Sequence, residues 1–502
     1  MRKYISTMWF TLARLILTIL LILCSPILFF AYGVLLIYRH IVFKVAKYLD
    51  PQLGKMVDAL SNLFSAHDVY NNSYTINIGL HAAGKVDKYH FVQAFSDGIL
   101  SQRTPEGQFL YPELTQKIVT KFGYTFWRNL DNFKVTDHIR YLNESSPDAP
   151  VTVKEMRDLI SQFGKTPLDP SRSPWEIIVI KNFVNDKHPE VKSAMILRLH
   201  HCMFDGYSVF NVFNKLTDNG ITLAGTPLQN PLTDGKRWWL KYLVMPIVFF
   251  FRGPYELFGQ ALSYDSNKLI QTSKENFRGV MRFDECEPIS LVELKEIKNY
   301  YGVSMIALTT GLVAGGLKKF LAKKGVPPQK IHMTFPLPVI NHPDKLRNYF
   351  SGGIISMDLR NKDRRVLLEA IQKKFYEFRF TYASGLPECS MLLLRVFGSL
   401  PSFLVPRIDN VPLSSTLMHT SFPGPADLGH FYGLPIVDST VGGSISKPFP
   451  VGTLCYSYNG VYKFGMMADA CIFTTQKEAE EMCNFVYEEF QILLQSVREN
   501  NV

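Results

Sequence analysis

The stretch PWEIIVIKNFVNDKHPEVKSAMILRLHHCMFDG, residues 174–206, sets the layout of the first half of the chain. Two apolar runs, Trp175–Phe183 and Lys192–Leu199, flank a short polar turn. Apolar runs of this length on both sides of a turn predict an antiparallel pair of strands. Pairing about that turn places Trp175 roughly opposite Leu199, so the beginning of the first strand and the end of the second share one rim of a sheet.

Two adjacent histidines, His200 and His201, follow the second run at this rim, and Asp205 and Gly206 come shortly after them. Apolar residues then recur at helical spacing, so we expect a helix to start soon after Gly206. A loop between a strand end and a helix is a position where binding and catalytic sites commonly form.

A neutral imidazole accepts a proton near neutral pH, which makes these histidines candidates for a general base. Asp205 can hold the loop through an ion pair or hydrogen bonds, or it can orient His201, and the spacing does not distinguish the two roles. Gly206 permits either a backbone angle closed to other residues or a close approach by a substrate. The competing interpretation is a pair of core histidines whose nitrogens bond to backbone carbonyls.

The sequence lacks the patterns of several other chemistries. It contains no GxSxG elbow of serine hydrolases, no HExxH zinc motif and no GxxxxGK[ST] phosphate loop. Adjacent histidines cannot use helical spacing to share a zinc ion, and the seven cysteines include no CxxC pair. We therefore expect no metal site and no disulfide framework, and we expect free thiols in a reducing compartment.

Length and charge limit the class of protein. The chain has 502 residues, which favours two or more domains, and 47% of them are hydrophobic. The formal net charge is +10, so we expect an anionic partner, either a membrane surface or a nucleotide-containing ligand such as coenzyme A. No helix-turn-helix, zinc-finger or RNA-binding signature is present, so we expect no nucleic-acid partner.

Residues 1–50 are predicted to form a membrane anchor. The segment Leu15–Tyr38 contains no charged residue and is long enough to cross a bilayer, which takes about 20 apolar residues. It exceeds the apolar region of a signal peptide, which is about 7–15 residues long. Basic residues flank both ends, so the positive-inside rule favours neither orientation. Pro26 leaves two forms open, a hairpin that enters and leaves the same face or one kinked span.

A second apolar stretch, Trp238–Phe251, is too short for a span and carries Lys241 and Pro246. It fits either a helix at a membrane interface or a buried linker helix. Two glycosylation sequons, Asn71-Asn72-Ser73 and Asn143-Glu144-Ser145, report on the side of the membrane. We expect the bulk of the chain on the cytosolic side, and sugar on either sequon would instead place it in the lumen.

Helical and strand-like patterns intermix on both sides of a Pro- and Gly-rich break near residues 220–235, which predicts an α/β fold of two lobes. The expected parts are a first lobe at 60–225, an apolar crossover linker at 226–275 that is either at the membrane interface or buried, and a second lobe at 276–502. Predicted helices are Ser290–Tyr301, Ser304–Lys324, Arg365–Tyr382 and Lys477–Val497, and further predicted strands are Ile331–Pro336, Gly353–Leu359 and Tyr462–Met467.

The motif HHCMFDG resembles the HHxxxDG motif of the coenzyme A-dependent acyltransferase superfamily, and within it the wax ester synthase/diacylglycerol acyltransferase family. Four more segments resemble that family in type and order: LSNLFSAHDVY (60–70), PLDPSRSPWE (167–176), LRNYFSGGIISMDL (346–359) and TSFPGPADLGHFYGLPIVD (420–438). They depart from its pattern at single positions, such as Arg347, where the family has glycine. The resemblance runs from about residue 60 to the C-terminus.

The resemblance implies a chloramphenicol-acetyltransferase-like α/β fold with a tunnel between the two lobes. It implies that His201 is the general base, that Asp205 is architectural and that His200 has a supporting role. It also implies that Gly206 sets the loop geometry. Asp205 usually pairs with an arginine in the superfamily, and the sequence does not identify that partner here.

Pro174, Trp175 and Asn348 are expected to bind substrate on the same ground. The resemblance implies acyl-CoA as a co-substrate with no further cofactor, and a long-chain alcohol or diacylglycerol as acceptor at an endoplasmic reticulum or lipid-droplet membrane. Two alternatives stay open: the same chemistry on a sterol or short alcohol, and a membrane protein that binds lipid without catalysis.

Overall fold

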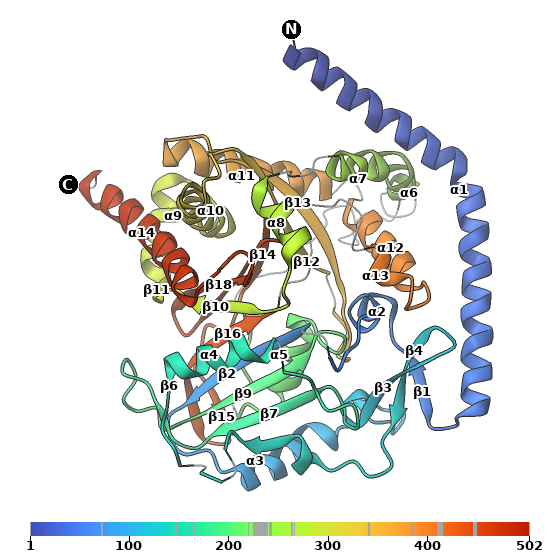
Figure 1. The fold of residues 1–502 in the computed structure, drawn as a ribbon, viewed down its shortest axis with the longest axis vertical. Coiled ribbons are helices and arrows are strands. Elements are labelled where there is room, and N and C mark those ends of the chain that lie inside the picture. The colour runs from blue at the N-terminus through green and yellow to red at the C-terminus, as the bar shows by residue number, and fades with distance from the viewer. Residues whose placement is uncertain are drawn as a thin grey trace.

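A computed structural model of the chain describes residues 2–71, 74–143, 145–146, 148–164, 166–218, 220–223, 239, 243–262, 265, 267–339, 342–382, 386–408, 415–444 and 449–500. Two sheets with flanking helices form two lobes, and the long N-terminal helix runs along one side of them (Figure 1). This arrangement agrees with the α/β class and the two lobes that the sequence predicts.

The first lobe is built on a six-stranded sheet in the order β15-β16-β2-β9-β7-β5. Neighbouring strands are antiparallel, except that β5 and β7 are parallel. Every residue of β9 is buried. The strands are β2 (Thr75–Ala82), β5 (Ile139–Tyr141), β7 (Trp175–Ile180), β9 (Ser193–His200), β15 (Gly429–Phe431) and β16 (Leu434–Gly443).

Small sheets and helices complete this half of the chain. The strands are β1 (Leu53–Met56), β3 (Gln116–Lys121) and β4 (Tyr124–Asn129) in one sheet, and β6 (Val151–Thr152) and β8 (Phe183–Val184) in another. The helices are α2 (Ala59–Ser65), α3 (Lys88–Phe95), α4 (Val153–Phe163) and α5 (Gly206–Asn214).

The predicted hairpin is confirmed in its register. β7 pairs antiparallel with β9, and Trp175 lies opposite Leu199. α5 begins at Gly206, as the helical spacing predicts. The turn after His200 therefore lies between the end of a central, fully buried strand and the first turn of a helix.

The second lobe has a sheet in the order β10-β18-β17-β14-β12-β13, with β11 paired to β18. All four predicted helices form here, with ends within about three residues of the prediction. The strands are β10 (Met281–Glu285), β11 (Ile289–Ser290), β12 (Lys330–Pro338), β13 (Phe350–Asp358), β14 (Leu417–Phe422), β17 (Val451–Tyr458) and β18 (Val461–Asp469). The helices are α8 (Lys268–Asn276), α9 (Leu291–Tyr301), α10 (Met305–Lys323), α11 (Arg364–Tyr382), α12 (Leu386–Gly398), α13 (Val405–Ile408) and α14 (Gln476–Asn500).

Part of the second half of the chain belongs to the sheet of the first lobe. β15 and β16 come from the second half of the sequence, yet β16 pairs with β2 in the sheet of the first lobe. The predicted second lobe, residues 276–502, therefore differs from the structure in one segment, because residues 429–443 extend the sheet of the first lobe. β17 then returns the chain to the sheet of the second lobe.

Buried charges join the exchanged strand to the second lobe. Lys463 of β18 is 2% exposed, and its ammonium lies 3.1 Å from Glu285 Oε2 of β10 and 2.6 Å from Asp438 Oδ1 of β16. The hydroxyl of Tyr456 donates to Glu285 and lies close to the Ser439 carbonyl. Because each charge has a partner of opposite sign, the network meets the cost of burying them.

The N-terminal segment is a single helix, α1 (Arg2–Leu49), that contains Pro26. The hairpin alternative is therefore wrong, because no turn separates two apolar halves. Residues Met8–Leu49 are long and apolar enough to cross a membrane by length and composition. Figure 1 shows α1 bending along its course, as expected of a helix that contains proline.

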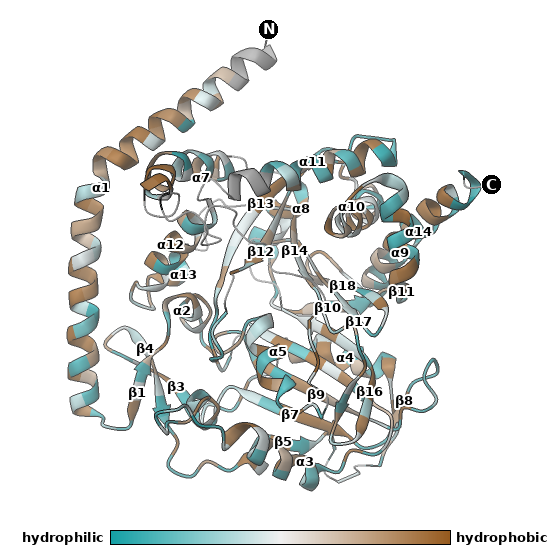
Figure 2. Cartoon of the chain, turned by 180° about the vertical axis from the view of Figure 1, so that it is seen from behind, coloured by the Kyte–Doolittle hydropathy of each residue, from teal (hydrophilic) through white to brown (hydrophobic). Residues whose placement is uncertain are grey.

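α1 docks onto the lobes at two places. Arg14 pairs with Glu256 at 2.8 Å and lies over the ring of Tyr255, both in α7 (Gly253–Ala261). Further along, Val42 and Ala46 are buried in a small core that includes Leu53, Tyr124 and Phe126. Most other side chains of α1 are apolar and exposed, and Figure 2 shows this hydrophobic character along the helix.

The described part of the second apolar stretch is helical and lies beside α1. α6 (Met245–Ile247) and η5 (Val248–Arg252) lead into α7, and Phe250 packs edge-on against Phe29 of α1 at 6.4 Å. Ile247, Phe250 and Phe251 are exposed, so this segment and α1 present one apolar face. Trp238 and Lys241 lie outside the described residues.

Replacing Lys463 with methionine is expected to lower the free energy of unfolding by about 3–5 kcal/mol, because Asp438 would lose its ammonium partner and Glu285 would keep only Arg157 at 3.9 Å. Adding Glu285→Gln and Asp438→Asn should recover part of that loss. Urea unfolding in detergent measures it. Lys187→Met removes an exposed pair with Glu287 and should cost less than about 1 kcal/mol, and equal losses in the two single variants would contradict a structural role for the buried network.

Candidate active site

The backbone of the two histidines is held from both neighbouring strands. The N–H of His200 donates to the Pro174 carbonyl at 3.1 Å, and the N–H of His201 donates to the Tyr74 carbonyl at 2.6 Å. β9 lies between β2 and β7, so the end of this strand cannot shift without breaking bonds on both sides. The predicted rim is therefore a rigid base for the loop that follows.

His201 is the partly exposed histidine of the pair. Its imidazole stacks on Phe64 of α2, with ring centroids 4.1 Å apart and planes 11° apart. Burial lowers the pKa of His201 below its ordinary value, while backbone contacts and the negative charge of Asp205 oppose that shift. A lowered pKa keeps the ring neutral near pH 7, which is the form that accepts a proton.

His200 is fully buried and faces the turn itself. Its Nδ1 accepts a hydrogen bond from the N–H of Cys202 at 3.2 Å, so the ring carries its proton on Nε2. Burial lowers the pKa of His200 to about 3, with the neighbouring His201 acting in the same direction. His200 therefore stays neutral and holds the turn that presents His201.

Asp205 connects the motif loop to the second lobe. It caps α5 by accepting from the Ser208 N–H at 2.9 Å, and it accepts from the Tyr349 N–H at 2.8 Å and from His342 Nε2 at 3.0 Å. Burial raises the pKa of Asp205, but the hydrogen bonds and charge of these partners outweigh burial and lower it. Asp205 is thus a carboxylate bonded across the lobe boundary.

Gly206 lies against the second lobe. A Cβ atom at this position would come within 3.1 Å of the Phe422 ring at the end of β14. Its φ lies outside the left-handed region, so glycine is needed here because there is little room for a Cβ atom and not because of the backbone angle. The group that lies close to Gly206 is therefore the Phe422 side chain and not a substrate.

Asn348 is fully buried at the same boundary. Its side-chain amide donates to the His201 carbonyl at 2.6 Å and to Ser61 Oγ of α2 at 3.1 Å. The sequence predicted a substrate-binding role for Asn348, and the structure instead shows it holding the backbone of the motif. Four of the segments that carry the resemblance therefore meet here, contributing Ser61 and Phe64, the motif itself, Asn348, and Phe422.

Trp175 is a core residue and does not line a substrate entrance, which corrects the prediction made from the sequence. It is 2% exposed, its indole N–H donates to the Leu114 carbonyl, and its ring stacks between Phe95 and His138. Pro174 is buried and supplies the carbonyl that holds His200. Both residues build the rim beneath the histidines.

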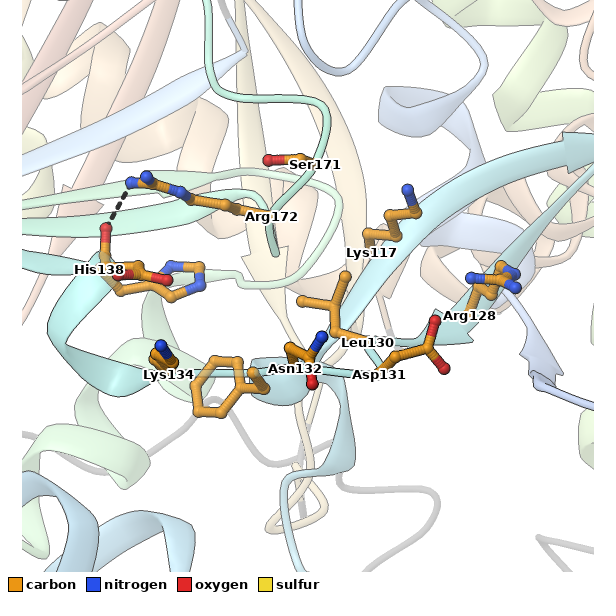
Figure 3. A pocket seen from close by; sticks show the side chains of 11 residues that line it. Lys117, Arg128, Leu130, Asp131, Asn132, Lys134, His138, Ser171 and Arg172 are labelled. Carbon is orange, nitrogen blue, oxygen red and sulfur yellow. Dashed lines mark hydrogen bonds between the residues drawn. The ribbon is translucent and has the colours of Figure 1, made fainter.

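A separate pocket of about 350 Å³ lies on the first lobe, and His138 and Arg172 are among the residues that line it (Figure 3). None of its lining residues belongs to the histidine motif, and both of its arginines are paired with acids, Arg128 with Asp50 and Arg172 with Asp169. We place no reaction there. Among the residues that the structure describes, no group of three His, Cys, Asp or Glu side chains is arranged to hold a metal ion.

The contacts of Ser61, Phe64 and His342 were not predicted. Ser61 and Phe64 lie within a segment that resembles the family, but neither residue type indicated contact with the motif. His342 follows β12 in the sequence NHPDKLRN, where no spacing relates it to Asp205, 137 residues away. Such contacts depend on how the lobes meet, and local patterns carry no information about that.

Comparison with known proteins agrees with this geometry. The model of the wax ester synthase/diacylglycerol acyltransferase catalytic domain matches residues 56–231, which include the hairpin and the motif. Wax ester synthase/diacylglycerol acyltransferase 3 of Arabidopsis thaliana is 23% identical over 237 residues, or 42% of this chain and 45% of that protein. The plant's protein 4 is 20% identical over 444 residues, or 77% of this chain and 81% of that protein. The matched part thus spans less than half of the first relative.

Solved structures show the same fold. The wax ester synthase/diacylglycerol acyltransferase from Marinobacter aquaeolei VT8 has a TM-score of 0.60 at 15% identity, covering 88% of this chain and 100% of that one. A trichothecene 15-O-acetyltransferase from Fusarium sporotrichioides has a TM-score of 0.57 at 12% identity, covering 86% and 94%. The two-lobed acyltransferase fold is confirmed, and residues 56–231 match the catalytic domain of the wax ester synthase/diacylglycerol acyltransferase family.

Proposed function

We propose that the protein transfers a fatty acyl group from acyl-CoA to the hydroxyl of a lipid acceptor. The observation that carries this proposal is the environment of His201: a neutral, partly exposed imidazole whose backbone is bonded to the first lobe on one side and to Asn348 of the second lobe on the other. A base held by both lobes can act on two substrates that meet between them.

In this reaction His201 is the proton acceptor, and its neighbours fix its position. His201 takes the proton from the acceptor hydroxyl, and the oxygen attacks the thioester carbonyl of acyl-CoA to form a tetrahedral intermediate. The C–S bond then breaks, and coenzyme A leaves as a thiol with the proton that His201 carries. His200 and Asp205 position the loop without exchanging protons, and Gly206 lets Phe422 pack against it. Access to His201 through a tunnel between the lobes belongs to this proposal.

The net charge and the exposed apolar surface support the choice of substrates. A net charge of +10 suits acyl-CoA, and the apolar face of α1 and residues 243–252 suits a lipid surface. A long-chain alcohol or diacylglycerol reaches such an enzyme by lateral diffusion, so we propose wax ester or triacylglycerol as product. A sterol or short alcohol as acceptor, or lipid binding without catalysis, are the alternatives that the assay below separates.

Membrane attachment through α1 is part of the same proposal. Because Arg14 docks on α7 and Val42 docks near β4, α1 stays close to the lobes along much of its length. The protein therefore rests against the bilayer, with the lobes on the cytosolic side of an endoplasmic reticulum or lipid-droplet membrane. Asn143 is exposed, whereas Asn72 and Ser73 of the other sequon lie outside the described residues.

His201→Ala is expected to lower acyl transfer by about 10²–10⁴-fold, because the proton acceptor is lost. Membranes containing the protein are assayed with radiolabelled palmitoyl-CoA and either hexadecanol or diacylglycerol. His188→Ala, an exposed histidine in the β7–β9 turn, serves as the matched control and should leave the rate unchanged. Equal ester formation by His201→Ala and wild type would remove the base from the mechanism, and retained lipid binding without ester formation in wild type would favour the binding alternative.

The rate of acyl transfer is expected to fall on the acidic side at a pH below about 6.5, the ordinary pKa of histidine. Burial lowers the pKa of His201, so the neutral base persists to lower pH and is lost only as the pH falls through that lowered value. The pH dependence of kcat/KM reports this midpoint for the free enzyme. A midpoint above the ordinary value would show that burial does not control the base.

The triple change Ile247→Ser, Phe250→Ser and Phe251→Ser is expected to weaken vesicle binding and to raise the KM for an acceptor held in vesicles, because three exposed apolar contacts with lipid are lost. Flotation with vesicles and an assay on a soluble short alcohol separate docking from chemistry. Val292→Ser changes an even more exposed apolar residue, in α9, and is the control. Unchanged KM on vesicles would exclude this segment from the membrane face.

A further inference from the structure

His342 is the partner of Asp205 that the sequence left unassigned. It lies in the segment between β12 and β13, and its side chain is 5% exposed. Nε2 lies 3.0 Å from Asp205 Oδ2, and Nδ1 lies 2.8 Å from the carbonyl oxygen of Pro343. Both ring nitrogens are therefore within hydrogen-bond distance of a partner.

The partners determine the charge of this ring. A backbone carbonyl oxygen only accepts, and Asp205 is a carboxylate that already accepts from the N–H groups of Ser208 and Tyr349. Each nitrogen of His342 must then donate, and only the imidazolium form has two N–H donors. This donor requirement favours the imidazolium form of His342 opposite Asp205.

No other acid competes for this cation among the described neighbours. In its own segment, Asp344 pairs with Lys215 at 3.0 Å, and Arg347 pairs with Asp58 at 3.5 Å. The remaining groups that face the ring are Tyr207 of α5, stacked at 6.1 Å, and Tyr349, edge-on at 5.7 Å, with Ser208 Oγ 3.5 Å from Nε2. Asp205 is therefore the acid that holds the proton on His342.

We infer that His342 is a positioning residue whose protonated ring holds the catalytic loop between the lobes, so that removing its proton loosens the loop. The segment from His342 to Tyr349 grips the motif at two points, through Asp205 and through the Asn348 bond to the His201 carbonyl. Loss of the proton removes the charge opposite Asp205 and one donor, and it loosens the first of these points. An arginine would keep its charge at alkaline pH.

This inference rests on the proposed acyl transfer for its kinetic consequence but not for the ion pair itself. The ion pair requires the imidazolium form of His342 and is lost when that proton is removed. Wild type should therefore lose activity on the alkaline side, in addition to the acidic limb that His201 causes. A misplaced base loses rate steeply, because a shift of about 1 Å can cost about 10²-fold.

The test compares wild type with His342→Arg and His342→Gln in membranes, with pH profiles of kcat and KM. His342→Arg should flatten the alkaline limb, and His342→Gln should lower kcat about 10- to 100-fold at neutral pH with less effect on KM. His188→Arg, which adds the same charge on an exposed turn, is the control and should keep the wild-type profile. An alkaline limb identical in wild type and His342→Arg would overturn the inference.

A second measurement does not depend on activity. In protein labelled with carbon-13 and nitrogen-15 histidine, the resonance that disappears in His342→Gln should show an imidazolium with two N–H groups at neutral pH. A neutral ring would overturn the inference even if acyl transfer is found. If no acyl transfer is found but the imidazolium is, the ion pair stands and the proposed function fails. His342→Arg should also keep its thermal stability at alkaline pH where wild type loses it.

Discussion

The hydrogen bond from the Asn348 amide to the His201 carbonyl is the contact on which the site depends. It joins a buried side chain of the second lobe to the backbone of the first lobe at the residue proposed as the base. An unsatisfied buried donor costs about 1–3 kcal/mol, so the two lobes are held in the arrangement that gives the Asn348 NH2 group its acceptors, the His201 carbonyl and Ser61 Oγ. Asp205 and Ser61 add polar partners at the same boundary, and the loop position becomes a property of both lobes.

Such bonds have defined geometry only if the lobes cannot slide. The exchanged strand β16 provides that restraint, because it is hydrogen-bonded in the sheet of the first lobe while its Asp438 is paired with Lys463 of the second. A shift of one lobe would expose or separate buried charges, and separating them is strongly unfavourable. The buried ionic network and the site at the motif are therefore two parts of one interface.

Local patterns predicted the elements well and the contacts between lobes poorly. The register of Trp175 opposite Leu199 follows from the length of the two strands and the turn, which are local quantities. The exchange of β16 and the pairing of His342 with Asp205 join residues far apart in sequence, and no periodicity encodes them. Trp175 was misplaced for a related reason: its neighbours on the rim were predicted, but the aromatic rings that enclose it came from elsewhere.

Histidines in this small region differ in charge, one neutral and one cationic. The difference follows from their hydrogen-bond partners. His200 is fully buried, and its Nδ1 accepts a hydrogen bond from the backbone N–H of Cys202, which is possible only for a neutral ring. His342 is nearly as buried but faces a carboxylate and a carbonyl, which require a cation. His201, with a pKa lowered by burial and with part of its ring exposed, is the histidine left free to gain and lose a proton. His200 holds the turn and His342 holds the lobes together, and both are needed because the position of the base must stay fixed while its charge changes.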